Sequence, residues 1–253
     1  MNKRIEKLRQ ESLDTQPYIS IQRASLLTEA YKIHNGTVSA PVLRALAFKY
    51  VLENKSICIG EGELIVGERG EAPRATPTFP ELCCHTLEDL EMINNRKKIS
   101  FIVNQEVKEI QKEKIIPYWE NRSMRSRIFK EMTPEWKDCY TAGIFTEFME
   151  QRAPGHTVAD DKIYHKGFSD FIRNIEKNIQ NLDYLNDPEA YDKQEELKAM
   201  IICAKAIISF AGRYAEKALE MADVEKNPRR KKELQEIAEV CAYVPAHPPR
   251  DFW

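Results

Sequence analysis

The sequence has little that would set it apart from ordinary globular proteins. Only 9 of its 253 residues are Gly and 13 are Pro, which excludes fibrous and low-complexity chains. The 38 basic and 40 acidic side chains nearly cancel, so the chain is not built to neutralise nucleic acid or an anionic membrane. Residues 1–7 lack the apolar core of a signal peptide, and the most apolar run, 199–212, is too short to cross a bilayer. We therefore expect a cytoplasmic globular protein with no nucleic-acid or membrane partner.

Cysteine provides no regular framework. The six cysteines stand at positions 58, 83, 84, 139, 203 and 241, and without an export signal they are expected to be reduced and buried. Cys83 and Cys84 precede His85, but neighbouring side chains rarely converge on one ion and no second Cys or His pair follows at ligand spacing. We predict no metal site here. Cys83 and Cys84 are interpreted as packing or as a pocket wall, and any further role stays open.

Apolar residues recur at three- and four-residue spacing, which predicts a mainly α-helical fold with one irregular insertion. We expect helices over residues 21–34, 41–52, 164–179, 188–215 and 228–241. Ser20 is expected to cap the first of these helices, and Asp160 and Asp161 to cap the one that begins at Tyr164. The helix over 188–215, which Pro188 opens, should turn Met200 and Ala204 inward.

The irregular insertion covers residues 58–80. Residues 64–66 (LIV) are interpreted as a short strand between glycines, and 67–80 are too rich in Pro and Gly for regular structure. The glycines of 60–67 do not follow the G-x-G-x-x-G spacing of a nucleotide loop, and Glu61 and Glu63 would repel phosphate. We predict a tight turn that enters a strand.

Residues 145–157 mix aromatic, acidic and basic side chains without helical or strand periodicity, and a Pro-Gly turn then presents His156. Such a segment is typical of a pocket lining, where imidazole can orient a small polar substrate near neutral pH. An exposed loop in which Arg152 pairs with Glu147 or Glu150 accounts for the composition equally well.

Several motifs resemble the N-terminal part of glycyl radical enzymes related to pyruvate formate-lyase, and the resemblance extends over essentially all 253 residues. The motifs are ELIVGE (63–68), PTFPE (77–81), EQRAPGHT (150–157), IYHKGF (163–168) and VPAH (244–247). Within the family, CCHT (83–86), MTPEW (132–136) and residues 143–157 most resemble the hydroxyproline dehydratase branch.

The resemblance implies a barrel of two five-stranded half-sheets surrounded by helices. It also implies a glycyl radical, installed by a radical S-adenosylmethionine activating enzyme under anaerobic conditions and passed to a cysteine. The thiyl radical takes a hydrogen atom from a small-molecule substrate, and water then leaves from the adjacent carbon. Full-length members of the family are commonly homodimers.

Two signatures of the family are missing from these 253 residues: the Gly-Cys-x-Glu loop and the Arg-Val-x-Gly loop. We therefore expect residues 1–253 to be the N-terminal part of an incomplete ten-stranded α/β barrel, to bind no cofactor and to be inactive alone. The remainder of the barrel, or a complementing chain, would supply the catalytic residues. The resemblance places Phe148 on the wall of the substrate pocket and has His156 hydrogen-bond the substrate near the departing hydroxyl.

The expected reaction is radical dehydration of trans-4-hydroxy-L-proline to pyrroline-5-carboxylate. Alternatives are another glycyl radical enzyme, of the pyruvate formate-lyase (formate C-acetyltransferase) or glycerol/diol dehydratase type, and a non-catalytic helical remnant or interaction module.

Overall fold

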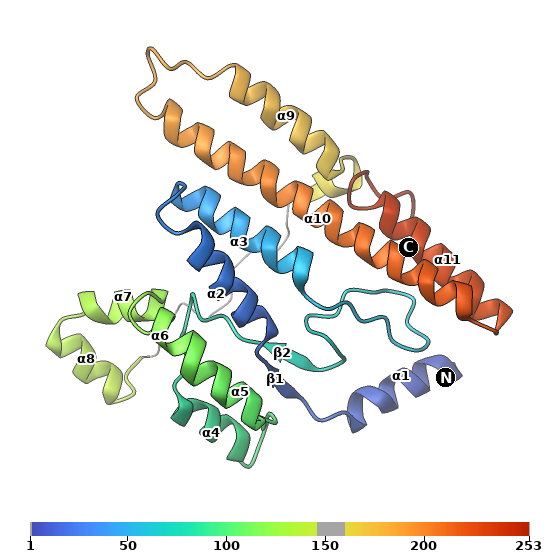
Figure 1. Cartoon of the computed structure of the whole chain (residues 1–253), viewed down its shortest axis with the longest axis horizontal. Helices are drawn as coiled ribbons and strands as arrows, with labels where there is room; N and C mark the ends of the chain where they lie inside the picture. The colour runs from blue at the N-terminus through green and yellow to red at the C-terminus, as the bar shows by residue number, and fades with distance from the viewer. Residues whose placement is uncertain (1, 146–159, 253) are drawn as a thin grey trace.

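The computed structural model describes residues 2–145 and 160–252, and it is mainly helical, as predicted (Figure 1). In chain order the elements are α1 (Lys3–Asp14), β1 (Tyr18–Ser20), α2 (Gln22–His34), α3 (Ala40–Asn54), β2 (Ala75–Pro77), α4 (Leu87–Asn95), α5 (Gln105–Ile110), the π-helical turn η1 (Gln111–Ile115), α6 (Ile116–Trp119), α7 (Met124–Glu131), α8 (Pro134–Thr141), the 3-10 turn η2 (Asp160–Tyr164), α9 (Phe168–Gln180), α10 (Ala190–Val224) and α11 (Pro228–Tyr243).

The 35-residue helix α10 runs along α3, α9 and α11 (Figure 1). Its buried face is rich in alanine, and such small side chains let neighbouring helices approach closely; Ala206 and Ala218 are almost fully buried. Leu234 and Ile237 of α11 fill the core between α10 and α11. These two residues confirm the apolar stripe expected for residues 228–241.

A second core joins α2 and α3 to α6. Trp119 is buried and donates from Nε1 to the Thr28 hydroxyl at 2.8 Å, which satisfies the indole N–H away from water. Pro117 has no backbone N–H and would crowd a preceding carbonyl in a regular helix. The widened turn η1 ends two residues before Pro117, where a wider helical turn relieves that crowding, and Ile115 is fully buried.

The described residues contain two short strands, β1 and β2, which pair in parallel with Tyr18 opposite Ala75 (Figure 1). The prediction of a strand at 64–66 is wrong: Leu64 and Ile65 form a bend, Val66 has no regular structure, and Ile65 is 79% exposed. Gly62 and Gly67, which flank the run, have φ of +81° and +132°, so the chain turns on both sides of it. The expected tight turn is present, but it enters no strand.

Three sequence-based expectations, for the starts of α2 and α9 and for one face of α10, differ from the structure. Ser20 does not cap α2, because it ends β1 and its hydroxyl donates to the Glu71 carboxylate at 2.7 Å. Tyr164 is exposed and ends η2. The helix α9 begins only at Phe168, with Gly167 at its N-cap position, so the N-cap predicted at positions 160 and 161 is wrong. Met200 is 53% exposed and does not face the core.

Candidate functional site

The two substrate-binding residues that the resemblance indicated, Phe148 and His156, lie outside the described residues. The structure does show what holds the chain on both sides of residues 146–159. Phe145 ends the upstream part, and η2 begins the downstream part.

On the upstream side, an aromatic cluster joins α7 and α8 and holds Phe145. The Phe145 ring lies 5.1 Å from the Trp136 ring and 6.0 Å from the Tyr140 ring, in edge-on geometry. The Tyr140 ring in turn packs 4.8 Å from Phe129, and Arg125 lies 4.3 Å over the Phe129 ring. Neither α7 nor α8 contains a fully buried residue, so these ring contacts are a main part of what holds the two helices together.

On the downstream side, two of the sequence motifs meet. The carbonyls of Pro245 and Ala246, in the VPAH motif, cap the N-terminus of α9. Phe168 N donates to Pro245 O at 2.9 Å, and Ser169 N donates to Ala246 O at 3.1 Å. A Cβ on Gly167 would lie 2.2 Å from the Ala246 oxygen, so only glycine allows this approach.

The PTFPE motif connects α2 to the start of α7. The Arg23 guanidinium lies 4.0 Å over the Phe79 ring and pairs with the Glu81 carboxylate. Glu81 O and Leu82 O accept from the first two backbone N–H groups of α7 at 2.9 Å each. The motif therefore positions α7, and through α7 the aromatic cluster that precedes residue 146.

Cys84 is half-buried beside Trp119 and its neighbours, where packing was predicted. Burial, and to a smaller degree the charge of Glu120, raises the pKa of the Cys84 thiol to about 11, so it is protonated at neutral pH. Gln111 fixes the local backbone by donating to His85 O at 2.7 Å. Over residues 2–145 and 160–252 no three His, Cys, Asp or Glu side chains come together as a metal site.

The glycine-rich run 60–67 is tied to α11. Glu63 accepts from Gly60 N at 2.7 Å, and Arg230 donates to Glu63 O at 2.7 Å and to Gly60 O at 3.2 Å. Arg230 follows Gly60 by 170 residues, so no local pattern predicts their contact. The available signal is the pair of adjacent arginines directly after Asn227-Pro228, a helix start, and it does not identify what they contact.

The profile of the family described as Pyruvate formate lyase-like matches residues 1–253. The chain is 53% identical over 249 residues to a trans-4-hydroxy-L-proline dehydratase of Clostridioides difficile, covering 98% of this chain and 32% of the relative. It is 32% identical over 248 residues to an isethionate sulfite-lyase of Oleidesulfovibrio alaskensis, covering 94% of this chain and 30% of that protein.

Solved structures agree with these matches. The crystal structure of the Clostridioides difficile hydroxyproline dehydratase with trans-4-hydroxy-L-proline bound superposes with a TM-score of 0.93 at 53% identity, over 98% of this chain and 32% of that one. A glycerol-bound glycerol dehydratase of Clostridium butyricum gives 0.90 at 31% identity, over 100% and 32%. The chain thus spans about a third of the length of these relatives. From its first to its last residue, it belongs to the Pyruvate formate lyase-like family of glycyl radical enzymes.

Proposed function

We propose that residues 1–253 form the N-terminal part of a glycyl radical dehydratase that converts trans-4-hydroxy-L-proline to pyrroline-5-carboxylate. The observation that carries this proposal is the 53% identity, over 98% of the chain, to a dehydratase of that substrate. Identity to a glycerol dehydratase is 31%, so the similarity favours hydroxyproline over a diol.

In this proposal the chain supplies the wall and a hydrogen-bonding group of the substrate pocket. Phe148 packs against the substrate ring, and the His156 imidazole donates to the hydroxyl that leaves. Loss of hydroxide from a radical intermediate requires a proton or a strong hydrogen-bond donor, and an imidazole with a pKa near neutrality suits that role. The reacting cysteine and its acidic neighbour would come from the remainder of the barrel, which these 253 residues do not contain.

The proposed setting follows from the same family. A separate radical S-adenosylmethionine enzyme would install the glycyl radical, the full-length protein would be a homodimer, and the reaction would take place in an anaerobic cytoplasm. None of the helices described here combines the length and the apolarity that crossing a bilayer requires.

A chimera tests the proposal directly. Residues 1–253 are joined to the remaining two thirds of the Clostridioides difficile dehydratase, activated without oxygen, and assayed for glycyl radical by electron paramagnetic resonance and for loss of hydroxyproline. We expect both signals. A radical without hydroxyproline turnover would refute the substrate, and turnover of glycerol instead would support the diol alternative.

A pair of histidine variants in the chimera tests the site. His156→Gln is expected to lower kcat by about 100- to 10,000-fold, the range typical of a lost general acid, with the radical signal intact. His165→Gln is the matched control, because His165 is exposed just after η2 and has no role in the proposal. Equal activity of the two variants would remove His156 from the mechanism.

A further inference from the structure

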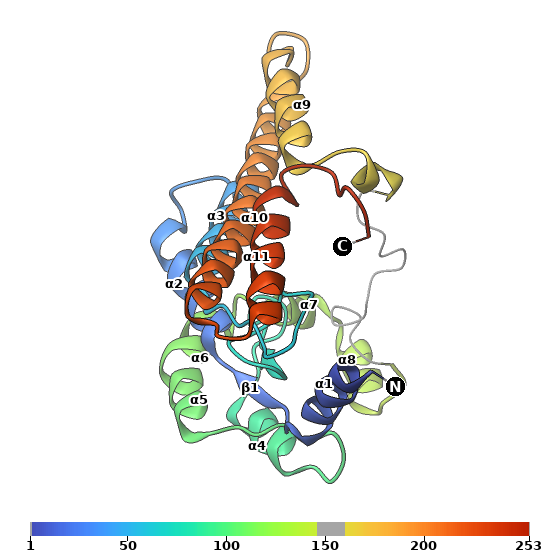
Figure 2. The same ribbon diagram turned by 90° about the vertical axis from the view of Figure 1, so that its right-hand side faces the viewer.

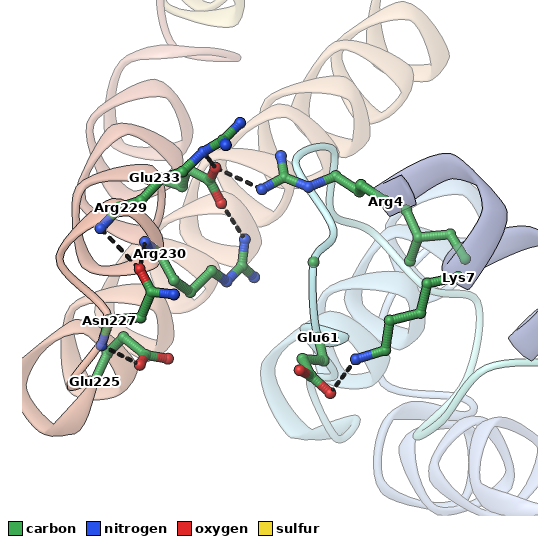
Figure 3. A pocket seen from close by; sticks show the side chains of 10 residues that line it. Arg4, Lys7, Glu61, Glu225, Asn227, Arg229, Arg230 and Glu233 are labelled. Atoms are coloured by element: carbon green, nitrogen blue, oxygen red, sulfur yellow. Dashed lines mark hydrogen bonds and ion pairs between the residues drawn. The ribbon is translucent and has the colours of Figure 1, made fainter. Parts of the chain in front are cut away.

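A pocket of about 260 Å³ lies between α1, the turn at 60–62 and the start of α11, far in sequence from residues 145–157 (Figure 3). Four basic side chains line it: Arg4, Lys7, Arg229 and Arg230. Neither the family similarity nor the proposed dehydration gives this pocket a role.

The pocket carries a small excess of positive charge, because its four basic side chains face three carboxylates, Glu61, Glu225 and Glu233. The Glu233 carboxylate, 11% exposed, accepts from Arg4 at 2.5 Å and from Arg229 and Arg230 at 3.3 Å each (Figure 3). Three guanidinium groups therefore share one carboxylate. Lys7 pairs with the 81% exposed Glu61 at 2.8 Å on the rim, and that pair is close to neutral.

The arginines differ in how many donors they have left. Both terminal nitrogens of Arg230 are engaged, since they also donate to Glu63 O and Gly60 O. Arg229 contacts Glu233 only through Nε, and its side chain is 80% exposed, which leaves the two terminal nitrogens of its planar fork available. Arg4 likewise uses a single terminal nitrogen on Glu233.

The start of α11 reinforces this charge. Asn227 caps the helix, with Oδ1 accepting from the backbone N–H groups of Arg229 and Arg230 at 3.0 and 3.3 Å. A helix of 16 residues carries partial positive charge at this end. Its first turn bears the two arginines that line the pocket, so side chains and backbone favour the same ligand charge.

We propose that this pocket binds a phosphate group, either inorganic phosphate or the phosphate of a small ester. Two features favour an oxyanion such as phosphate. The four basic side chains of the pocket exceed its three carboxylates, Glu61, Glu225 and Glu233, by one positive charge. The free terminal nitrogens of Arg4 and Arg229 can also hold more oxygens than the two of a carboxylate.

The test measures binding of inorganic phosphate by titration calorimetry to the chimera of residues 1–253 with the remainder of the Clostridioides difficile dehydratase, with acetate and chloride compared at matched ionic strength. We expect saturable binding of phosphate only. Arg229→Gln should weaken it about tenfold or more, the scale of one charge-assisted pair. Lys232→Gln is the matched control: Lys232 lies on the same helix, is 78% exposed and loses the same charge, but does not line the pocket.

Two further arms complete the design. A small phosphomonoester should compete with inorganic phosphate for the pocket, and its tighter binding would assign the site to an ester. Equal weakening by Arg229→Gln and Lys232→Gln would overturn the proposal, because it would mean that phosphate senses only overall charge. Acetate binding as strong as phosphate would overturn the choice of ligand. Far-UV circular dichroism confirms that both variants keep their helices.

Discussion

Substituting alanine for Glu233 removes the carboxylate that lies among three arginines, and we expect it to destabilise the contact between α1 and α11. Arg4 and Arg230 are 25% and 12% exposed, so neither guanidinium regains full hydration when its partner is lost. No residue of α1 is buried, and the ion pair from Arg4 is therefore a principal anchor of that helix. The perturbation acts on a polar junction rather than on a hydrophobic core.

The magnitude follows from the exposure of the partners. Removing one member of a fully buried ion pair costs about 3–5 kcal/mol, whereas exposed pairs contribute about 0–1 kcal/mol. The Glu233 cluster lies between these limits, because the Arg230 side chain is 12% exposed and that of Arg229 is 80% exposed. We expect Glu233→Ala to lower the free energy of unfolding by about 2 kcal/mol.

Urea unfolding followed by circular dichroism measures the change, with Glu236→Ala as control. Glu236 lies one turn further along α11, is half-exposed and pairs with Lys232 at 3.8 Å, so its loss should change the free energy of unfolding by less than about 0.5 kcal/mol. If Glu233→Ala and Glu236→Ala unfold at the same urea concentration, the assignment of Glu233 as the anchor of α1 is refuted.

The pH dependence gives a second check. Burial by itself would raise the pKa of Glu233, but hydrogen bonds from Arg4 and then Arg230 outweigh it and hold the pKa below its usual value. A carboxyl with a lowered pKa in the folded state stabilises the protein above its unfolded pKa of about 4.3. The stability difference between wild type and Glu233→Gln should therefore be constant near neutrality and shrink as the pH falls below about 4.

Three other predictions concern packing and reactivity. Gly167→Ala should destabilise the chain, because the new Cβ would meet a carbonyl oxygen at 2.2 Å. Gly212→Ala in α10 should stabilise it by about 0.5–1 kcal/mol, because no atom lies within 4 Å of the new Cβ. Thermal unfolding of the two variants measures both changes. Leu234→Ala, at a site 1% exposed, should lower the free energy of unfolding by about 3 kcal/mol and Leu219→Ala, at a site 50% exposed, by less than about 1, as measured in urea; equal losses would contradict the core assignment. Cys84, with a pKa of about 11, should react with iodoacetamide at pH 8 about a hundredfold more slowly than free cysteine. The reaction rate of Cys84 should still rise above pH 9. A rate that levels off at pH 9 would show that the thiol is not desolvated.

The helices with strong sequence periodicity were predictable, and the contacts between distant segments were not. Leu234 and Ile237 could be assigned to the core because the 3.6-residue repeat is a local property of the chain. The strand prediction at 64–66 was wrong because a run of three apolar residues does not distinguish a strand from a turn. The actual strands, β1 and β2, are three residues each and pair across 57 positions, beyond what local pattern can show.

In the candidate site, too, local motifs indicated residues, whereas the contacts between distant segments could not be predicted. Phe148 and His156 were indicated by a family motif and stay predictions. The residues that hold the flanking chain were present in the quoted motifs, but their roles depend on contacts that link Arg23 to Phe79, or Gly167 to Ala246. Such contacts arise from tertiary packing, so a motif marks their residues without revealing what they touch.

The capping of α9 by residues 245 and 246 makes the three long helices α9, α10 and α11 a closed circuit (Figure 2). The chain leaves at Phe168, runs outward along α9, comes back along α10 past the start of α9, and then reverses along α11 to the point where it began. A change of length within the circuit, for instance at the turn between α9 and α10, leaves that meeting point in place. A change at the meeting point releases both ends of the circuit at once, and with them η2, where the described chain resumes after residue 159.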